Sequence, residues 1–137
     1  MSQDMIIDPD RAQPLGRYPH TRCIGPWIFI SGTSSRLHDN SYVGAELVDG
    51  EWHLDIKAQT QAVMENIRHY LHLSGADLEH LVDVTVFLKD ITHFDAYNDV
   101  YNSFFPVTGP CRTTVAVSDL PKPQILIEIK ATAYKPD

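Results

Sequence analysis

This chain of 137 residues has little cysteine and no long apolar run. Its two cysteines, Cys23 and Cys111, have neither metal-binding nor redox spacing, so we interpret them as reduced thiols. No apolar stretch approaches the ~20 residues that a membrane-spanning helix needs. The first sixteen residues, MSQDMIIDPDRAQPLG, lack the basic start and apolar stretch of a signal peptide. These absences favour a cytoplasmic protein that has no membrane partner.

Positive charge is also scarce. Lys and Arg number 11 against 18 Asp and Glu, which gives a formal net charge of −7. The basic residues are scattered, and only Arg17, Arg22 and Arg36 fall in one neighbourhood. A nucleic-acid backbone would be repelled by this charge, so we expect no nucleic-acid partner.

The composition that remains is that of an ordinary globular protein, with 43% hydrophobic and 21% charged residues. One domain over residues 1–137 is expected, in which residues 1–21 form an extended lead-in. Alternating apolar and polar residues then predict strands. The predicted strands cover residues 27–31, two arms of a hairpin within 45–54, and residues 81–90, 112–117 and 124–134.

Local signals predict the turns and two helices. Asp49 and Gly50 are typical of a two-residue hairpin turn. The first helix should run from an N-cap at Asp55 to about Leu73, with Gly75 in a left-handed C-terminal cap. A capping box of Thr92 and Asp95 should begin the second helix, whose apolar stripe is Phe94, Tyr97, Tyr101 and Phe104. The order of elements predicts a two-layer α+β domain, with one mixed sheet and two helices on one face.

Arg112 is unexpected at the start of a strand that continues as Thr-Thr-Val-Ala-Val. Alternation puts Thr114 on its face of the sheet and Cys111 on the other. If this face and that of Glu128 both point away from the helices, the two charges share one surface. They could form an ion pair that fixes strand register. Alternatively, Arg112 binds a carboxylate while Glu128, with its pKa raised in apolar surroundings, moves protons.

Five segments across nearly the whole chain resemble the reactive imine/enamine deaminase family, the Rid or YjgF-like proteins. They are GRYPH, ISG, VTVFLKDITHF leading into YNDVYNSFF, GPCRTTV, and ILIEIKATAY. Within this family, ISGTSSR, GPCRTTVAV and LIEIKATAYKP most resemble the 2-aminomuconate deaminases. The resemblance implies a chorismate-mutase-like homotrimer, with sheets inside, helices outside and active sites between subunits.

Carried over to this chain, the resemblance implies that Arg112 clamps a carboxylate and that Glu128 is the acid/base or water-positioning group. Tyr18, Ser31 and Asn98 would line the site, with Thr114 where many relatives have cysteine. No metal or organic cofactor is implied, and no thiol is needed. The small-molecule carboxylate substrate would be 2-aminomuconate, hydrolysed to the 2-oxo dicarboxylate and ammonia. Its second carboxylate would bind Arg36, or failing that Arg22 or Arg17.

Other interpretations of these residues stay open. The protein could be a generalist imine deaminase or a non-catalytic trimeric regulator that binds a keto acid. Tyr18 could pack on a sheet edge, Ser31 could cap a strand, Asn98 could be a helix-surface amide, and Arg36 could be a solvated loop residue. His69 and His72 have helical spacing, but no carboxylate or cysteine completes a metal tetrahedron, so we expect solvated histidines.

Overall fold

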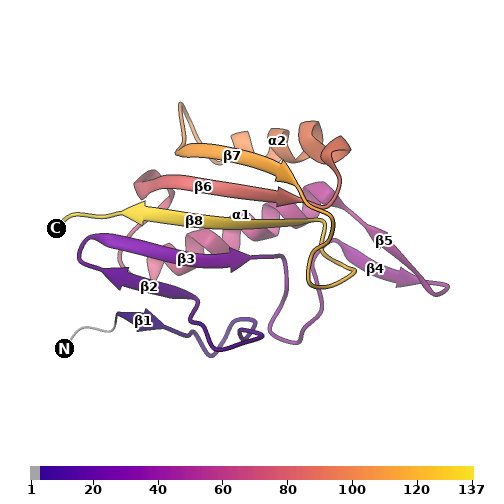
Figure 1. Cartoon of the computed structure of the whole chain (residues 1–137), viewed down its shortest axis with the longest axis horizontal. Helices are drawn as coiled ribbons and strands as arrows, with labels where there is room; N and C mark the ends of the chain where they lie inside the picture. The colour runs from indigo at the N-terminus through magenta and orange to yellow at the C-terminus, as the bar shows by residue number, and fades with distance from the viewer. Residues whose placement is uncertain (1–3) are drawn as a thin grey trace.

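A computed structural model describes residues 4–137 (Figure 1). In this part of the chain, six strands form one sheet in the order β1-β2-β3-β8-β6-β7. Their bounds are β1 Met5–Ile6, β2 Thr21–Ile24, β3 Trp27–Thr33, β8 Ile127–Tyr134, β6 Leu81–Leu88 and β7 Cys111–Ala116. Strands β6 and β7 are parallel and the other neighbours are antiparallel, so the predicted mixed sheet is confirmed.

The two α-helices, α1 (Ile56–His72) and α2 (Phe94–Asn102), cover the same face of this sheet (Figure 1). Apolar side chains of both helices and of the central strands form one core beneath them. Short 3₁₀ turns at Leu78–His80 and Ile91–His93 connect each helix to its neighbouring segments. A hairpin of β4 (Ala45–Val48) and β5 (Glu51–Leu54) lies apart from the sheet.

Three local predictions are confirmed. Asp49 and Gly50 have positive φ angles of 52° and 78°, as a type I′ hairpin turn requires. The Asp55 carboxylate accepts a hydrogen bond from the backbone N–H of Ala58 at 3.1 Å and so caps α1. Gly75, with φ of 74°, follows the end of this helix.

The capping box predicted from Thr92 and Asp95 is wrong. The Asp90 carboxylate instead accepts hydrogen bonds from the backbone N–H of Thr92 at 2.9 Å and from its hydroxyl at 2.8 Å. This contact turns the chain into the 3₁₀ segment, and α2 then begins at Phe94 without a side-chain cap. Because Asp90 already binds Thr92, the threonine is not available as an N-cap.

The start of the last strand and the structure of the N-terminal segment also differ from the prediction. The last strand begins at Ile127 rather than Gln124, because Gln59 of α1 binds the preceding backbone. Its side-chain oxygen accepts from the N–H of Leu126 at 2.9 Å, and its amide donates to the Gln124 carbonyl at 2.8 Å. Within residues 1–24, the described part contains β1 at the sheet edge and β2 beside it, two short strands that the alternation pattern did not indicate.

The sheet face away from the helices is uncovered in a single chain and carries several large apolar side chains. Trp27, Phe29, Val115 and Tyr134 on this face are each between 38% and 40% exposed. Their sequence neighbours Ile28 and Ala133 point the other way and are buried. No helix within residues 4–137 combines the length and hydropathy needed to cross a membrane.

Candidate functional site

Two of the predicted site residues, Arg112 and Glu128, lie on opposite sides of the sheet. In the parallel pairing of β6 and β7, Arg112 lies beside Val84 and Thr114 beside Val86. Both valines are buried in the core, so Arg112 and Thr114 face the helix-covered side. Glu128 lies beside Phe87 on the uncovered side. The expectation that Arg112 and Glu128 share one face of the chain is therefore wrong.

Neutral groups hold the Arg112 guanidinium at the outer edge of this helix-covered side. It donates to the side-chain oxygen of Asn98 at 2.8 Å, and its central carbon lies 4.7 Å from the ring centre of Tyr101. The rings of Tyr97 and Phe94 follow at 5.3 and 5.7 Å. None of the ion pairs within residues 4–137 includes Arg112. The register-fixing ion pair with Glu128 is thus absent.

The aromatic support for Arg112 was missed in the sequence, where these rings were interpreted only as the apolar stripe of α2. The Tyr97 hydroxyl also hydrogen-bonds to the Thr114 hydroxyl, which ties α2 to β7 beside the guanidinium. The Tyr101 hydroxyl is buried without a hydrogen-bond partner among residues 4–137, and burial raises its pKa to about 12 despite the nearby Arg112 charge. A cation held by π faces and one amide keeps most of its N–H donors for a ligand.

Glu128 is the charged site residue on the uncovered side of the sheet. Burial raises the pKa of its carboxyl group above the ordinary glutamate value. A Cβ atom at Gly32 would stand 3.1 Å from one carboxylate oxygen of Glu128, so any larger residue would crowd that group. This explains the glycine in the ISG segment, residues 30–32: the strand passes the Glu128 carboxylate at a position that has no side chain.

A pocket of about 50 Å³ adjoins this glycine and is lined by Tyr18, Ser31, Gly32 and Arg36, among others. The Ser31 hydroxyl donates to the Pro19 carbonyl at 2.8 Å, which fastens the Tyr18 segment to β3. Tyr18 itself is 44% exposed, and its hydroxyl accepts from the backbone N–H of Leu15 at 3.2 Å. Tyr18, Ser31 and Arg36 thus line one pocket, and Gly32 at its edge is the position beside the Glu128 carboxylate. Arg112, Asn98 and Thr114 do not line this pocket.

Arg36 is more constrained than a solvated loop arginine. It donates to the side-chain oxygen of Asn40 at 2.6 Å and to the backbone carbonyl of Gln13. These bonds connect the loop after β3 to the segment that carries Tyr18. As with Arg112, the acceptors are neutral, so the positive charge of Arg36 is not compensated by them.

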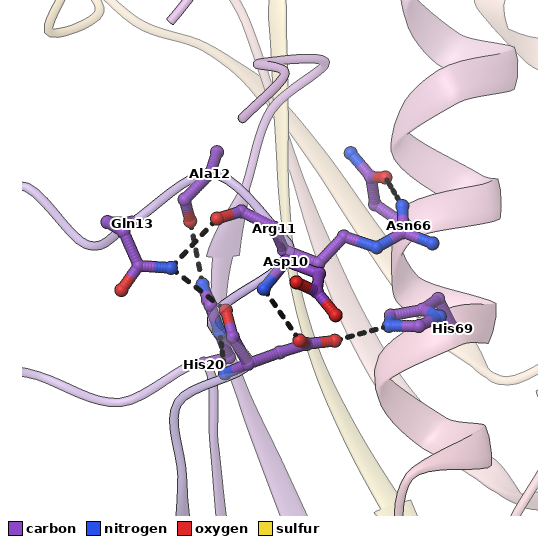
Figure 2. A network of polar contacts seen from close by, with 8 residues as sticks. Asp10, Arg11, Ala12, Gln13, His20, Asn66 and His69 are labelled. Carbon is purple, nitrogen blue, oxygen red and sulfur yellow. Dashed lines mark hydrogen bonds and ion pairs between the residues drawn. The ribbon is translucent and has the colours of Figure 1, made fainter. Parts of the chain in front are cut away.

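A polar network fastens the N-terminal segment to α1 (Figure 2). The Asp8 carboxylate pairs with His69 Nε2 at 2.7 Å, so the expectation of a solvated His69 is wrong. Arg11 donates to the Asn66 side chain at 3.1 Å. His72, also expected in solvent, has its ring nitrogen 3.3 Å from Asp77.

His20 is a residue of this network that sequence reasoning missed. Its ring is 7% exposed and stacks on Tyr70 with 4.7 Å between ring centres. Nδ1 accepts from the backbone N–H of Asp8 at 2.9 Å, and Nε2 faces the Ala12 carbonyl at 2.8 Å. These partners require the neutral ring with its proton on Nε2. Within residues 4–137, no three His, Cys, Asp or Glu side chains gather as metal ligands.

Sequence comparison identifies the family. The profile described as Endoribonuclease L-PSP matches residues 9–135. This chain belongs to that family. A RutC family protein of Pyrococcus abyssi is 39% identical over 135 residues, which cover 98% of this chain and 99% of the relative.

Other members of the L-PSP family carry different functional names. A protein of Dermatophagoides farinae, named 2-iminobutanoate/2-iminopropanoate deaminase, is 32% identical over 124 residues, covering 89% of this chain and 90% of the relative. A crystal structure from Yersinia pestis, described as a protein of unknown function of the conserved Rid family, has a TM-score of 0.81 at 30% identity. It covers 95% of this chain and 97% of that one. The resemblance to Rid proteins is confirmed at the level of the family.

Proposed function

We propose that this L-PSP family protein is a hydrolytic deaminase that converts 2-aminomuconate to the 2-oxo dicarboxylate and ammonia. The observation that carries the proposal is the state of Arg112, a half-buried guanidinium that neutral groups orient and that no carboxylate within residues 4–137 neutralises. The planar guanidinium group can donate two parallel hydrogen bonds, which suits it to bind a substrate carboxylate. The relative that is named an imine deaminase supports the reaction type.

In this proposal, Arg112 and Glu128 meet between subunits of a homotrimer whose sheets face inward. The apolar open face with Trp27, Phe29 and Tyr134 supports such an arrangement, because a large exposed apolar surface is typical of an interface. The edge position of β7 supports it too, since Arg112 then lies where a neighbouring chain can approach. Each active site would take Arg112, Asn98 and Thr114 from one subunit, and Tyr18, Ser31 and Glu128 from the next.

The reaction needs proton transfer and water, but no redox step. The enamine nitrogen loses a proton and the enamine carbon gains one, which gives the imine, and the oxygen of a water held by Glu128 adds to the C=N carbon. The proton lost from that water goes to nitrogen. The resulting carbinolamine then transfers its hydroxyl proton to the amino group, and ammonia leaves as the C–O bond becomes a carbonyl. A carboxyl group with a raised pKa is suited to accept and return these protons, while Arg112 fixes the carboxylate beside the reacting carbon.

A generalist imine deaminase is the second candidate, because the Dermatophagoides farinae relative is named for small 2-imino acids. The family description also names a ribonuclease. A formal charge of −7 disfavours RNA binding and gives no support to that activity.

The deciding experiment measures ammonia release from enzymatically generated 2-aminomuconate and from 2-aminoacrylate. We expect kcat/KM to be higher for 2-aminomuconate. Equal or faster turnover of 2-aminoacrylate would favour the generalist. If neither compound releases ammonia while keto acids still bind, the protein is a non-catalytic binder.

A further inference from the structure

A second cavity, of about 280 Å³, adjoins the Glu128 half of the proposed site. Its lining residues are Leu15, Arg36, Asn40, Tyr42, Lys122 and Gln124. Arg36 also lines the smaller pocket beside Ser31 and Gly32, so this one side chain borders both spaces. Gly32, which lines that pocket, is also the position at which a Cβ atom would stand 3.1 Å from a Glu128 carboxylate oxygen. A ligand that reaches past Glu128 could therefore extend into the cavity next to Arg36.

The cavity carries uncompensated positive charge. Two of its six lining residues are cations, Arg36 and Lys122, and none is a carboxylate. Neither cation takes part in an ion pair within residues 4–137, although the chain as a whole has a net charge of −7. Two unpaired cations that line one cavity favour a bound anion.

Two polar side chains add to this arrangement. Tyr42 is 7% exposed; burial raises its pKa, while the Arg36 charge lowers and the Glu128 charge raises it. Tyr42 pairs with Arg36 through a backbone bridge and lines the cavity, where the charges of both Arg36 and Glu128 act on it. The Gln124 amide oxygen is buried without a partner among the described residues. Rotating this amide would direct its N–H groups to the same place, so a ligand can satisfy it in either orientation.

The neighbouring arginines fit this role less well. Arg17 lines a more apolar cleft with Met5, Ile7 and Tyr18. Arg22 lies on β2 beside Phe29, so it points to the open face of the sheet. Only Arg36 of these three borders both the Ser31 pocket and a cavity with a second cation.

We propose that Arg36 and Lys122 form a subsite for a second carboxylate, which makes the site selective for dicarboxylates over monocarboxylates. Both residues bind the second carboxylate of the ligand. Arg36 binds it from the side nearer the proposed reaction centre, and Lys122 binds it from the 122–124 loop. This inference rests on the proposed deaminase site, because that site holds the first carboxylate.

The test compares binding of two product-like acids that differ only at the far end, 2-oxoadipate and 2-oxohexanoate, by isothermal titration calorimetry. We expect the wild type to bind 2-oxoadipate at least about tenfold more tightly. Lys122→Gln should reduce this preference about tenfold, and Arg36→Gln at least as much, since a guanidinium can bind the far carboxylate through two parallel hydrogen bonds. Lys122 is exposed, so its loss should leave the fold intact. Lys57→Gln is the control, because Lys57 is an exposed lysine on α1 that pairs with Asp99.

The outcomes separate this subsite from the proposed reaction. Ammonia release without any preference for 2-oxoadipate would overturn the subsite and leave the reaction standing. A preference that depends on Arg36 and Lys122, in a protein that releases no ammonia, would uphold the subsite and overturn the reaction. A preference that Lys122→Gln and Lys57→Gln change equally would also overturn the subsite.

Discussion

At the scale of single residues, Arg112 is oriented without being neutralised. The Asn98 amide fixes one edge of the guanidinium, and the faces of Tyr97 and Tyr101 support its plane. A lysine ammonium could retain the charge over these rings, but not the planar fork that fits a carboxylate. The shape of this group, rather than its charge alone, is what the proposed chemistry uses.

We therefore expect Arg112→Lys to fail nearly as badly as Arg112→Ala. For both variants kcat/KM should fall by about two to three decades, because a charge-assisted pair in a partly buried site is lost. Arg68→Lys is the matched control, since Arg68 also lies over an aromatic ring, 5.3 Å from the centre of Phe104. Kinetics and melting temperature are measured together. A stable Arg112→Ala protein with normal turnover would end the clamp hypothesis.

Glu128 should reduce stability at neutral pH in proportion to its burial. Its folded-state pKa is raised above the ordinary value of 4.5, so the native protein binds this proton more tightly than the unfolded chain does. The contribution of the group to stability is therefore most favourable at low pH and falls as pH rises through that raised pKa. A neutral residue of the same shape avoids this loss.

Glu128→Gln should accordingly melt at a higher temperature than the wild type near neutral pH, while its turnover falls because it cannot exchange a proton. The difference in melting temperature should shrink as pH is lowered from roughly 8 to 4. Glu65→Gln, at an exposed glutamate of α1, is the control. An equal shift in both variants, or a loss of stability in Glu128→Gln, would show that burial does not destabilise this carboxylate.

At the scale of elements, the segment from Asp8 to Tyr18 is positioned by its contacts with α1. Asp8 pairs with His69, and Arg11 binds Asn66 one helical turn away (Figure 2). Farther along, Tyr18 and Pro14 line the pocket beside Ser31. The Asp8–His69 ion pair therefore helps to position the pocket residues, because residues 8–18 connect Asp8 to Tyr18.

We expect Asp8→Asn to lower the free energy of unfolding by about 1 kcal/mol, because the pair is partly buried. The bond to His69 lowers the pKa of Asp8, so this contribution is present above the ordinary aspartate value of 3.8 and is lost as pH falls through the lowered pKa. Denaturant unfolding across this range checks it. Asp10→Asn, at an exposed aspartate of the same segment, should show no such loss.

The same variant should change catalysis in a defined way. Because the segment carries Tyr18, Asp8→Asn should raise KM more than it lowers kcat. A fall in kcat alone would mean that Asp8 does not act by positioning the pocket.

The sequence correctly predicted those elements whose boundaries are determined by residues close together in the chain. Asp49-Gly50 defines its turn and Asp55 its helix start within four residues of chain, and both are observed. The late start of β8 depends on Gln59, which lies 65 residues from Gln124, and no local pattern reports such a contact. β1 and β2 are likewise short strands that exist by pairing with their neighbours.

The site was predictable as a set of residues but not as an arrangement. Alternation correctly put Cys111 and Arg112 on opposite faces of β7. It could not say which face α2 covers, and so it failed to separate Arg112 from Glu128. The aromatic rings beneath Arg112 were visible as a helical stripe, but their role depends on the packing of α2 beside β7.

At the scale of the whole molecule, the sheet itself separates the two proposed catalytic residues. Arg112 faces the helices and Glu128 faces the open side. Within one chain, the sheet therefore lies between these two side chains. If both act on one substrate, Glu128 must come from a second copy, which the apolar open face is suited to bind.

Subunit mixing tests this arrangement directly. Arg112→Ala and Glu128→Gln proteins, each inactive alone, are co-refolded in equal amounts, and trimers are verified by sedimentation. If each site combines Arg112 of one subunit with Glu128 of the next, random association restores about a quarter of the wild-type activity. The matched control mixes wild type with the Arg112→Ala/Glu128→Gln double variant. It also gives about a quarter for shared sites, but about half if both residues act within one chain. No recovery in the first mixture, or a wild-type protein that sediments as a stable monomer at micromolar concentration, would rule out the shared site.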